Sequence, residues 1–325
     1  MKVLVTGGAG YIGSHVVWQL RARGDEVTVV DDFVTGVAER IGDTPSHRLS
    51  LEDDASVDAL GRLMAGHDAV IHFAARKRVD ESVRRPAWYY QQNVGSLANV
   101  LLAMETAGVP TIVFSSSAAV YGASEGEHLV ETTPTIPINP YGRTKLIGEQ
   151  MLAEASAAAG FKAASLRYFN VAGAGRPELG DTAVLNLVPM VFERIDRGLP
   201  PLIFGDDYPT PDGTCIRDYI HVSDLADAHL AALDLLAASS VPGHEVFNIG
   251  TGGGSSVREM VDAILAVAGV DLVPEVRPRR AGDPAVVVAD PGTAAAVMGW
   301  QAQLGLTDIV ESAWAAHGLL AATDG

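Results

Sequence analysis

The stretch Lys2-Val-Leu-Val-Thr-Gly-Gly-Ala-Gly-Tyr-Ile-Gly13 decides the fold of this chain. Its apolar run Val3–Thr6 predicts a strand, and the pattern that overlaps the last glycines predicts a helix over Tyr11–Arg23. A second strand is predicted at Glu26–Asp31, and its core is apolar on both faces, as expected for a parallel strand covered by helices on both sides. The start of the chain therefore predicts a strand–helix–strand unit.

Three glycines in this unit predict a dinucleotide site. Gly7, Gly10 and Gly13 lie where the backbone must turn tightly and approach a pyrophosphate, and the helix amino end supplies free N–H groups and a partial positive charge. Asp31 ends the second strand, where its carboxylate can accept hydrogen bonds from an adenosine ribose. Asp32 follows with no arginine close by in the sequence, so NAD is favoured over NADP. The competing interpretation is a tight turn that binds no ligand.

The first half of the chain alternates short apolar runs with longer helical patterns. Further strands are predicted at Ala69–Phe73, Thr111–Ser115 and Ala163–Tyr168. Further helices are predicted at Ser56–Ala65, Trp88–Ala107 and Tyr141–Ala159. The alternation predicts an α/β fold with a doubly wound parallel sheet of the Rossmann type.

The character of the sequence changes after about Asn170, where glycine and proline become frequent and helices alternate with single short strands. We predict an NAD-binding Rossmann domain over residues 1–175 and a smaller, carboxy-terminal α/β substrate-binding domain over residues 176–325. Residues 217–250 are expected to return to the first domain, because Val222–Ala238 and Glu245–Ile249 have the pattern of another helix and strand.

Bulk composition narrows the classes of function. The chain has 325 residues, 48% of them hydrophobic, which is enough to bury a sizeable core. Its net charge of −17 repels nucleic acids and anionic membrane surfaces, and no run of apolar residues is long enough to span a bilayer. The single cysteine, Cys215, excludes an internal disulfide, and the histidine spacing predicts no metal site. These features favour a cytoplasmic protein with a local basic site for any anionic ligand.

A second motif, Tyr141-Gly-Arg-Thr-Lys145, predicts acid–base chemistry. Four-residue spacing places Tyr141 and Lys145 on one face of a helix, where an ammonium group stabilises phenolate over phenol. An oxidised nicotinamide acts in the same direction, so Tyr141 is expected to serve as a base near neutral pH. Ser117 lies just beyond a strand end, at the edge of the sheet where a hydroxyl can face a substrate. The competing interpretation is an amphipathic helix that carries a solvated lysine.

Matches to a known family extend over essentially the whole chain. In the first part they comprise the two motifs above, His72-Phe-Ala-Ala75, Glu81-Ser-Val83 and Leu166-Arg-Tyr-Phe-Asn170. In the second part they comprise Ile203-Phe-Gly205, Asp207-Tyr-Pro-Thr210, Asp212-Gly-Thr214, Ile216-Arg-Asp-Tyr-Ile-His221 and Arg279-Arg-Ala-Gly-Asp283. On these residues the chain resembles the extended short-chain dehydrogenase/reductase family, and within it the epimerases that act on UDP-hexoses.

The resemblance implies interconversion of UDP-glucose and UDP-galactose through a 4-keto sugar. It implies that Tyr141 takes the proton of the 4-hydroxyl while NAD accepts and then returns a hydride. It also implies that Ser117 hydrogen-bonds the 4-oxygen, and that Lys145 binds the nicotinamide ribose and tunes Tyr141. A homodimer is expected, joined by a four-helix bundle from Trp88–Ala107 and Tyr141–Ala159.

Two further sets of residues are assigned by the same resemblance. Residues expected to contact the cofactor are Gly7, Gly10, Tyr11, Ile12, Gly13, Asp31, Phe73, Ala74, Lys77, Asn93, Tyr141, Lys145 and Phe169. Residues expected to hold the UDP-sugar are Ser117, Asn170, Asn186, Leu187, Arg217, Arg280 and Asp283. Planar guanidinium groups suit a diphosphate on an acidic protein, although a surface salt bridge is the alternative role of each arginine.

Two departures from the family pattern affect specificity. The family commonly has Gly-Asp near the adenine, whereas this chain has Leu51 and Glu52 there, which leaves the adenine contacts open. A position that is often aromatic in members strict for unsubstituted hexoses aligns with Val287. A smaller side chain leaves room beside the sugar C2 substituent, so UDP-N-acetylhexosamines are expected as additional substrates.

Two other functions compete with C4 epimerisation. A nucleotide-sugar 4,6-dehydratase or a UDP-glucuronate decarboxylase uses the same scaffold, but the Thr-Asp-Glu of the dehydratases is replaced here by Ser117-Ala118-Ala119. A non-catalytic NAD sensor or scaffold is the alternative from another class. Such a binding module has no need of Ser117, Tyr141 and Lys145 together.

Overall fold

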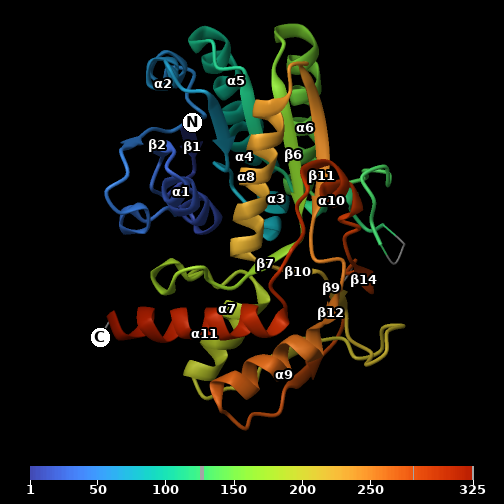
Figure 1. Ribbon diagram of the computed structural model, residues 1–325. Coiled ribbons are helices and arrows are strands. Elements are labelled where there is room, and N and C mark those ends of the chain that lie inside the picture. Colours follow the sequence, from blue (N-terminus) through green and yellow to red (C-terminus); the bar gives the residue numbers. More distant parts are fainter. Residues whose placement is uncertain (125–127, 281, 324–325) are drawn as a thin grey trace.

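The computed structural model describes residues 1–124, 128–280 and 282–323, and Ala281 of the Arg279–Asp283 motif lies outside these residues. The chain forms a large three-layered unit around a parallel sheet and a smaller unit at one end of it (Figure 1). Helices of the larger unit run beside the sheet, whereas α11 crosses the smaller unit below it (Figure 1).

The central sheet has seven parallel strands in the order β11-β6-β5-β4-β1-β2-β3. Their bounds are β1 Lys2–Thr6, β2 Glu26–Asp31, β3 Ser46–Arg48, β4 Ala69–His72, β5 Thr111–Ser115, β6 Lys162–Tyr168 and β11 Gly243–Ile249. The predicted doubly wound sheet is confirmed. β3 was not among the predicted strands, because its three residues are all exposed and give no apolar run.

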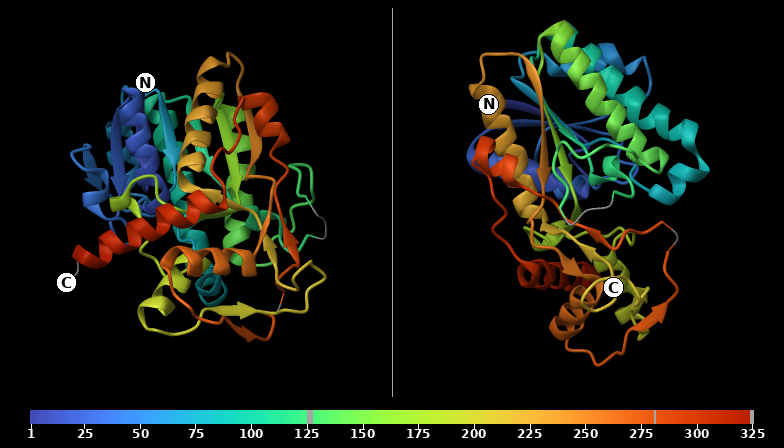
Figure 2. Two further views of the ribbon diagram at one scale, coloured as in Figure 1. Left: turned by 60° about the horizontal axis from the view of Figure 1, so that its bottom comes forward. Right: turned by 90° about the vertical axis from the view of Figure 1, so that its right-hand side faces the viewer.

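Helices cover both faces of this sheet (Figure 2). One face carries α1 Tyr11–Arg23, α8 Val222–Ala238 and α10 Gly292–Met298, and the other carries α2 Ser56–Met64, α5 Ser96–Ala107 and α6 Pro140–Ala159. The helix predicted at Trp88–Ala107 is divided into α4 Pro86–Tyr90, a π-helical turn Gln91–Gly95 and α5. A short helix, α3 Val79–Arg84, precedes it.

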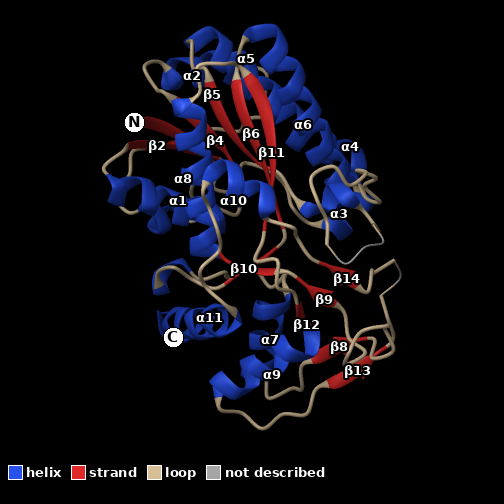
Figure 3. Cartoon of the chain, turned by 45° about the vertical axis from the view of Figure 1, so that its right-hand side comes forward, coloured by secondary structure: helices blue, strands red, loops and turns tan. Residues whose placement is uncertain are grey.

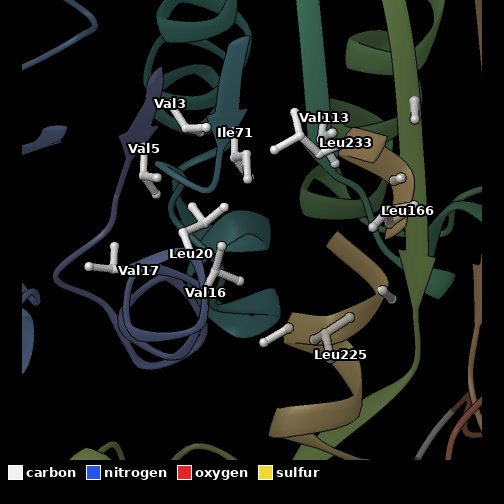
Figure 4. Close-up of a cluster of buried hydrophobic side chains, with 14 of the residues drawn as sticks. Val3, Val5, Val16, Val17, Leu20, Ile71, Val113, Leu166, Leu225 and Leu233 are labelled. Carbon is white, nitrogen blue, oxygen red and sulfur yellow. The ribbon is translucent and has the colours of Figure 1, made fainter. Parts of the chain in front are cut away.

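Each face of the sheet has its own apolar core. Val3, Val5 and Ile71 point from the sheet toward Leu20 of α1 and its neighbours, and Leu225 and Leu233 bring α8 onto the same cluster (Figure 4). Alternate residues of the same strands, such as Leu4 and Val70, pack against α2, α5 and α6. Because successive strand residues point to opposite faces, strands buried on both sides are apolar along most of their length.

The smaller unit combines helices with three short sheets (Figure 3). Its helices are α7 Leu187–Asp196, α9 Val257–Ala268 and α11 Leu306–Thr323. Its strands form the pairs β7 Asn170–Ala172 with β10 Tyr219–His221 and β8 Leu202–Phe204 with β13 Glu275–Arg277, and the sheet of β12 Ser255–Ser256, β9 Ile216–Arg217 and β14 Val286–Val287. Three 3₁₀ turns, at Ala38–Ile41, Ala118–Tyr121 and Pro177–Leu179, complete the fold.

The chain crosses between the two units more than once. β9 and β10 lie in the small sheets, whereas α8 and β11, which follow directly, belong to the layers of the large sheet. The division into domains at residue 175 remains a prediction. None of the helices in residues 1–124, 128–280 and 282–323 is both long and apolar enough to cross a membrane.

Candidate active site

A pocket runs along the carboxyl edge of the large sheet, where β1, β2 and β4 end. This is the edge at which open α/β sheets bind ligands. The predicted cofactor contacts that line the pocket are Gly7, Gly10, Tyr11, Ile12, Gly13, Asp31, Phe73, Ala74, Lys77, Tyr141 and Lys145. Leu51 and Glu52 line it too, so the segment that departs from the family pattern lies in the same pocket as Asp31.

The glycine loop is packed too closely for side chains. Gly7 has a φ of +68°, and a Cβ added there would lie 2.6 Å from the backbone nitrogen of Ala74. A Cβ at Gly13 would lie 2.4 Å from the carbonyl oxygen of Gly7. Gly10 precedes α1 and has no side chain to cap it, so the first-turn amides remain available for an anion. This cradle fits the pyrophosphate of a dinucleotide.

Asp31 is held in place by the loop itself. Its carboxylate accepts hydrogen bonds from the backbone nitrogens of Ala9 (3.0 Å) and Phe33 (2.8 Å). Burial raises the pKa of Asp31, while these two hydrogen bonds lower it. The carboxylate is thereby fixed at the end of β2, facing the pocket, as a ribose acceptor requires.

The tertiary structure brings an arginine to this carboxylate pair, contrary to the sequence-based expectation that none lies close by. Arg76 follows β4, and its Nη2 forms a 2.6 Å ion pair with Oδ2 of Asp32. Its Nε donates to Gln92 at 3.0 Å, and Arg48 Nη1 donates to the carbonyl oxygen of Asp32. The guanidinium of Arg76 is therefore already bound by a carboxylate and an amide, so it is not free to bind a 2′-phosphate. The region suits a ribose hydroxyl instead.

Two predicted cofactor contacts lie outside the pocket lining. Asn93 is buried and bonded to protein: its Oδ1 accepts from the Arg76 backbone nitrogen, and its Nδ2 donates to the Arg76 carbonyl and to Thr144. It fixes the pocket wall at Arg76. Phe169 is buried in an apolar cluster with Val120 and Tyr121, which belong to the turn that follows Ser117.

Helix α6 begins in a way that places Tyr141 closely. The side chain of Asn139 caps the helix by accepting a 2.8 Å hydrogen bond from the Gly142 nitrogen, and Pro140 occupies the first turn. Gly142 itself is required, because a Cβ there would lie 2.4 Å from the carbonyl oxygen of Ala119. The helix thus starts directly against the turn that carries Ser117.

Tyr141 and Lys145 line the pocket, whereas Ser117 lies beside Tyr141 outside the pocket lining. Ser117 follows β5, its hydroxyl accepts from the Ala119 nitrogen at 3.2 Å, and its proximity to the Tyr141 phenol lowers the pKa of that phenol. One turn farther along α6, Lys145 Nζ donates to the Ser115 carbonyl oxygen at 2.7 Å. The three predicted catalytic groups therefore converge from β5 and α6, with Tyr141 and Lys145 both facing the pocket.

The pKa values differ from the sequence-based expectation. Burial raises the pKa of Tyr141 well above its usual value, and only the hydrogen bond with Ser117 is found to lower it. Burial disfavours the charged form of Lys145 too, and it lowers the pKa of this lysine to about 7, although the Glu149 carboxylate raises it. Lys145 directs its ammonium to Ser115, so this chain's own residues do not make Tyr141 acidic. An oxidised nicotinamide in the pocket would supply positive charge near this phenol.

The predicted UDP-sugar residues lie mainly in the smaller unit. Arg217 in β9 forms a 3.2 Å ion pair with Asp283, and its side chain is 12% exposed. Arg280 stacks on the ring of Phe204 at 4.1 Å. Arg217 and Asp283, both predicted to hold the UDP-sugar, thus bind each other. Both arginines are held by neighbours that orient their planar guanidinium groups.

Three other predicted substrate residues lie where the two units meet. Asn170 begins β7 and is exposed, and Asn186 precedes α7 and donates to Asp181 at 3.2 Å. Leu187, the first residue of α7, packs partly into the core of the smaller unit. The loop before Asn186 lines the cofactor pocket, so Asn186 and Leu187 follow directly in the chain after residues of that pocket.

Sequence reasoning missed several pocket residues. Arg40 reaches the pocket from the turn after β2 and donates to the Gly180 and Leu179 carbonyl oxygens. Asp181, Thr182, Ala183 and Leu185 line the pocket from the smaller unit. These residues belong to loops with no motif or periodicity, so only the tertiary structure brings them to the site. Within the described ranges, no group of three or more His, Cys, Asp or Glu side chains is placed to hold a metal ion.

Comparisons with known proteins agree with this geometry. Residues 3–250 match the model of the NAD dependent epimerase/dehydratase family. The chain belongs to the NAD dependent epimerase/dehydratase family. A UDP-glucose 4-epimerase of Azospirillum brasilense is 46% identical over 92% of this chain and 86% of its own length. One of Corynebacterium glutamicum is 42% identical over 97% of this chain and 95% of its own length.

Solved structures of the family share the whole fold. A UDP-glucose 4-epimerase from Brucella ovis in complex with NAD has a TM-score of 0.92 at 41% identity, covering 97% of this chain and 98% of that one. The UDP-Glc/GlcNAc 4-epimerase of Campylobacter jejuni has a TM-score of 0.86 at 39% identity, covering 98% and 99%. The resemblance inferred from the motifs is confirmed, as is NAD as the cofactor of the family.

We predict that Gly13→Ala abolishes NAD binding, because the added methyl group collides with the Gly7 carbonyl and forces the glycine loop open. Calorimetric titration of cofactor-free protein with NAD measures the effect, and we expect the affinity to fall at least about a hundredfold. Gly318→Ala is the matched control, because Gly318 lies in α11 with open space around its Cα. Equal affinities for the two variants would contradict this account of the loop.

Proposed function

We propose that this chain is an NAD-dependent epimerase that interconverts UDP-glucose and UDP-galactose at C4 of the hexose. The observation that carries the proposal is a pocket lined by both the glycine loop and the Tyr141–Lys145 pair, with Ser117 next to Tyr141 just outside the lining. Relatives named UDP-glucose 4-epimerase, 42% and 46% identical over nearly the whole chain, support the same reaction.

Each catalytic group has a distinct role in the proposed reaction. NAD held in this pocket would supply a reversible hydride acceptor for C4, so the reaction would involve no net oxidation. Tyr141 takes the proton of the 4-hydroxyl, and its burial in the pocket excludes water from the transfer. Ser117, which lies beside the Tyr141 phenol, binds the 4-oxygen and relays the proton. Lys145 binds the nicotinamide ribose and keeps a positive charge at the strand end.

The remaining predicted contacts divide between the two ligands. We assign the pocket-lining glycines, Tyr11, Ile12, Asp31, Phe73, Ala74 and Lys77 to NAD, with Asn93 and Phe169 as supports of the pocket. The arginines Arg217 and Arg280 are assigned to the diphosphate, since their planar groups are oriented and the protein is otherwise acidic. Asp283, Asn170, Asn186 and Leu187 complete the UDP-sugar site.

The competing reactions demand groups other than these. Dehydration across C5 and C6 needs an additional acid and base, whereas Ala118 and Ala119 begin a 3₁₀ turn directly after Ser117. Decarboxylation of UDP-glucuronate needs a pocket for the C6 carboxylate and stays the alternative enzyme. A binding module without catalysis has no need for Ser117 beside Tyr141 and Lys145.

We predict that purified protein converts UDP-galactose into UDP-glucose, followed by NMR of the anomeric protons. Tyr141→Phe keeps the ring but removes the proton acceptor, so turnover falls by about 10²–10⁴-fold. Tyr90→Phe, a change at a half-buried tyrosine of α4 outside the pocket lining, serves as the control. Wild-type turnover of UDP-glucuronate alone would establish the decarboxylase instead, and unaltered turnover by Tyr141→Phe would overturn the mechanism.

We propose that Val287 sets the size of the sugar pocket. It pairs with Arg217 across β14 and β9, and it packs against the cluster that contains Ala118 and Phe169. A valine at this position leaves space that an aromatic ring would fill. We therefore propose that UDP-N-acetylhexosamines are also substrates, in keeping with the name of the Campylobacter jejuni relative.

We predict that Val287→Tyr lowers kcat/KM for UDP-N-acetylglucosamine at least about tenfold relative to UDP-glucose, because the ring occupies the space of the acetamido group. Val286→Tyr is the control, since neighbouring strand residues point to opposite faces. Rates for both substrates measured with each variant give the ratio. A wild-type enzyme with no turnover of UDP-N-acetylglucosamine would sink the proposal.

The outer helices provide the surface for a homodimer. α5 and α6 lie side by side on the outside of the sheet (Figure 2), and Leu102 of α5 is 50% exposed there. Two such helix pairs, one from each copy, form the proposed four-helix bundle. An exposed leucine on a helix face is explained if the second copy buries it.

We predict a dimer of the wild-type protein by light scattering after size exclusion, and a monomer for Leu102→Glu at low micromolar concentration, because the carboxylate would be buried unpaired. Val273→Glu is the control, since Val273 is 81% exposed and lies far along the chain from the bundle. A monomeric wild-type protein would contradict the four-helix bundle.

From the proposed reaction we infer a role in galactose metabolism. From the free cysteine we infer that the protein acts in the cytoplasm. Cys215 is a free, buried thiol, which suits a reducing compartment.

A further inference from the structure

A buried carboxylate lies directly behind the catalytic groups. Glu149 follows Lys145 by one turn of α6, and its side chain is 5% exposed. Arg167 of β6 binds it with two hydrogen bonds, from Nε to Oε1 at 2.9 Å and from Nη2 to Oε2 at 2.6 Å. A third donor, the Ser116 hydroxyl, reaches Oε1 at 2.5 Å. Glu149 therefore lies behind the lining of the cofactor pocket, and it acts on that pocket through its neighbours.

The partner of Glu149 is itself fixed from several elements. Arg167 Nη1 donates to the Tyr121 hydroxyl at 2.9 Å and to the Glu131 carbonyl oxygen at 3.1 Å. Tyr121 in turn donates to Asn248 of β11 at 2.7 Å. The guanidinium therefore ties α6, β6 and β11 to the turn that follows Ser117. A carboxylate held by so many fixed donors has one position.

Two short paths lead from Glu149 to the catalytic residues. The first runs through Ser116, whose neighbours in the chain are Ser115, the acceptor for the Lys145 ammonium, and the catalytic Ser117. The second is electrostatic, because Glu149 lies on the same face of α6 as Lys145 and opposes the loss of its proton.

The other groups around this pair do not supply the same charge. Lys145 lies 4.9 Å from the Phe114 ring and beside His72, whose pKa burial lowers to about 3, so that His72 stays neutral. Burial also lowers the pKa of His244, which faces the Glu149–Arg167 pair. Burial raises the pKa values of Tyr141 and Tyr168, so these phenols stay uncharged. Glu149 is thus the anion that acts on Lys145.

We propose that Glu149 is a positioning residue for the epimerase site: it holds the Ser115–Ser117 strand end through Ser116 and places a carboxylate one helical turn behind the buried Lys145. The inference rests on the proposed function, but it concerns a residue outside the groups assigned to substrate and cofactor. Its two effects are separable, because Ser116 carries the first and the charge of the carboxylate carries the second.

The direct test measures the charge of Lys145. The chain has four lysines, so lysine labelled with ¹³C at Cε gives few signals, and Lys145→Met assigns the one of interest. In Glu149→Gln the titration midpoint of Lys145 is expected to move down by about one pH unit or more, because the neutral amide no longer stabilises the cation. Glu245→Gln removes an exposed carboxylate of β11 and is expected to leave the midpoint unchanged.

Kinetics give the second readout. Since protonated Lys145 is the active form, the alkaline limb of the kcat/KM profile moves to lower pH in Glu149→Gln. At a pH above the wild-type midpoint, the kcat of Glu149→Gln is then lower than that of the wild type by about tenfold for each pH unit by which the limb moves. The KM of the variant stays within about twofold of the wild-type value. Glu149→Asp keeps the charge and is expected to restore the position of the limb. A purely structural role would lower the unfolding temperature of Glu149→Gln without moving the limb.

Ser116→Ala covers the case in which Glu149→Gln fails to fold. It removes one hydrogen bond, and we expect kcat to fall several-fold while the Lys145 midpoint stays at its wild-type value. A folded Glu149→Gln with unchanged titration and pH profile, or an unchanged kcat in Ser116→Ala, would overturn the inference. Absence of wild-type epimerase turnover would instead overturn the proposed function, and the Lys145 titration would still decide the electrostatic part.

Discussion

A buried ammonium group is the constraint around which this site is organised. Lys145 is 3% exposed, and its Nζ donates to the backbone carbonyl oxygen at the end of β5. Removing such a charge from water is costly unless fixed dipoles and an anion replace the lost hydration. The strand end supplies the dipole and Glu149 supplies the anion.

That arrangement also fixes what the residues achieve without a ligand. The phenol of Tyr141 is buried next to Ser117, and burial raises its pKa, so the protein alone holds a neutral acid there. Chemistry at neutral pH requires further positive charge, which the oxidised nicotinamide of NAD carries. In the proposed mechanism, Tyr141 would therefore act as a base only with the cofactor bound.

Charge is distributed just as unevenly at the other end of the pocket. A protein of net charge −17 repels anions in general, so binding a dinucleotide and a nucleotide sugar depends on local donors. The glycine loop offers backbone amides, while Asp31 offers an acceptor for a ribose. Arg76 is tied to Asp32 and Gln92, so it shapes the pocket more than it attracts phosphate.

The sequence by itself determined the parallel sheet, the glycine loop, Asp31 and the Ser117–Tyr141–Lys145 group, because these depend on local spacing: apolar runs, glycines at a turn, and residues one helical turn apart. Only the tertiary structure decided the ion pair of Arg76 with Asp32, the contacts of Arg40 with the smaller unit, and the direction of the Tyr141 and Lys145 pKa shifts. Burial and long-range contacts depend on how distant segments pack, and no local pattern encodes them.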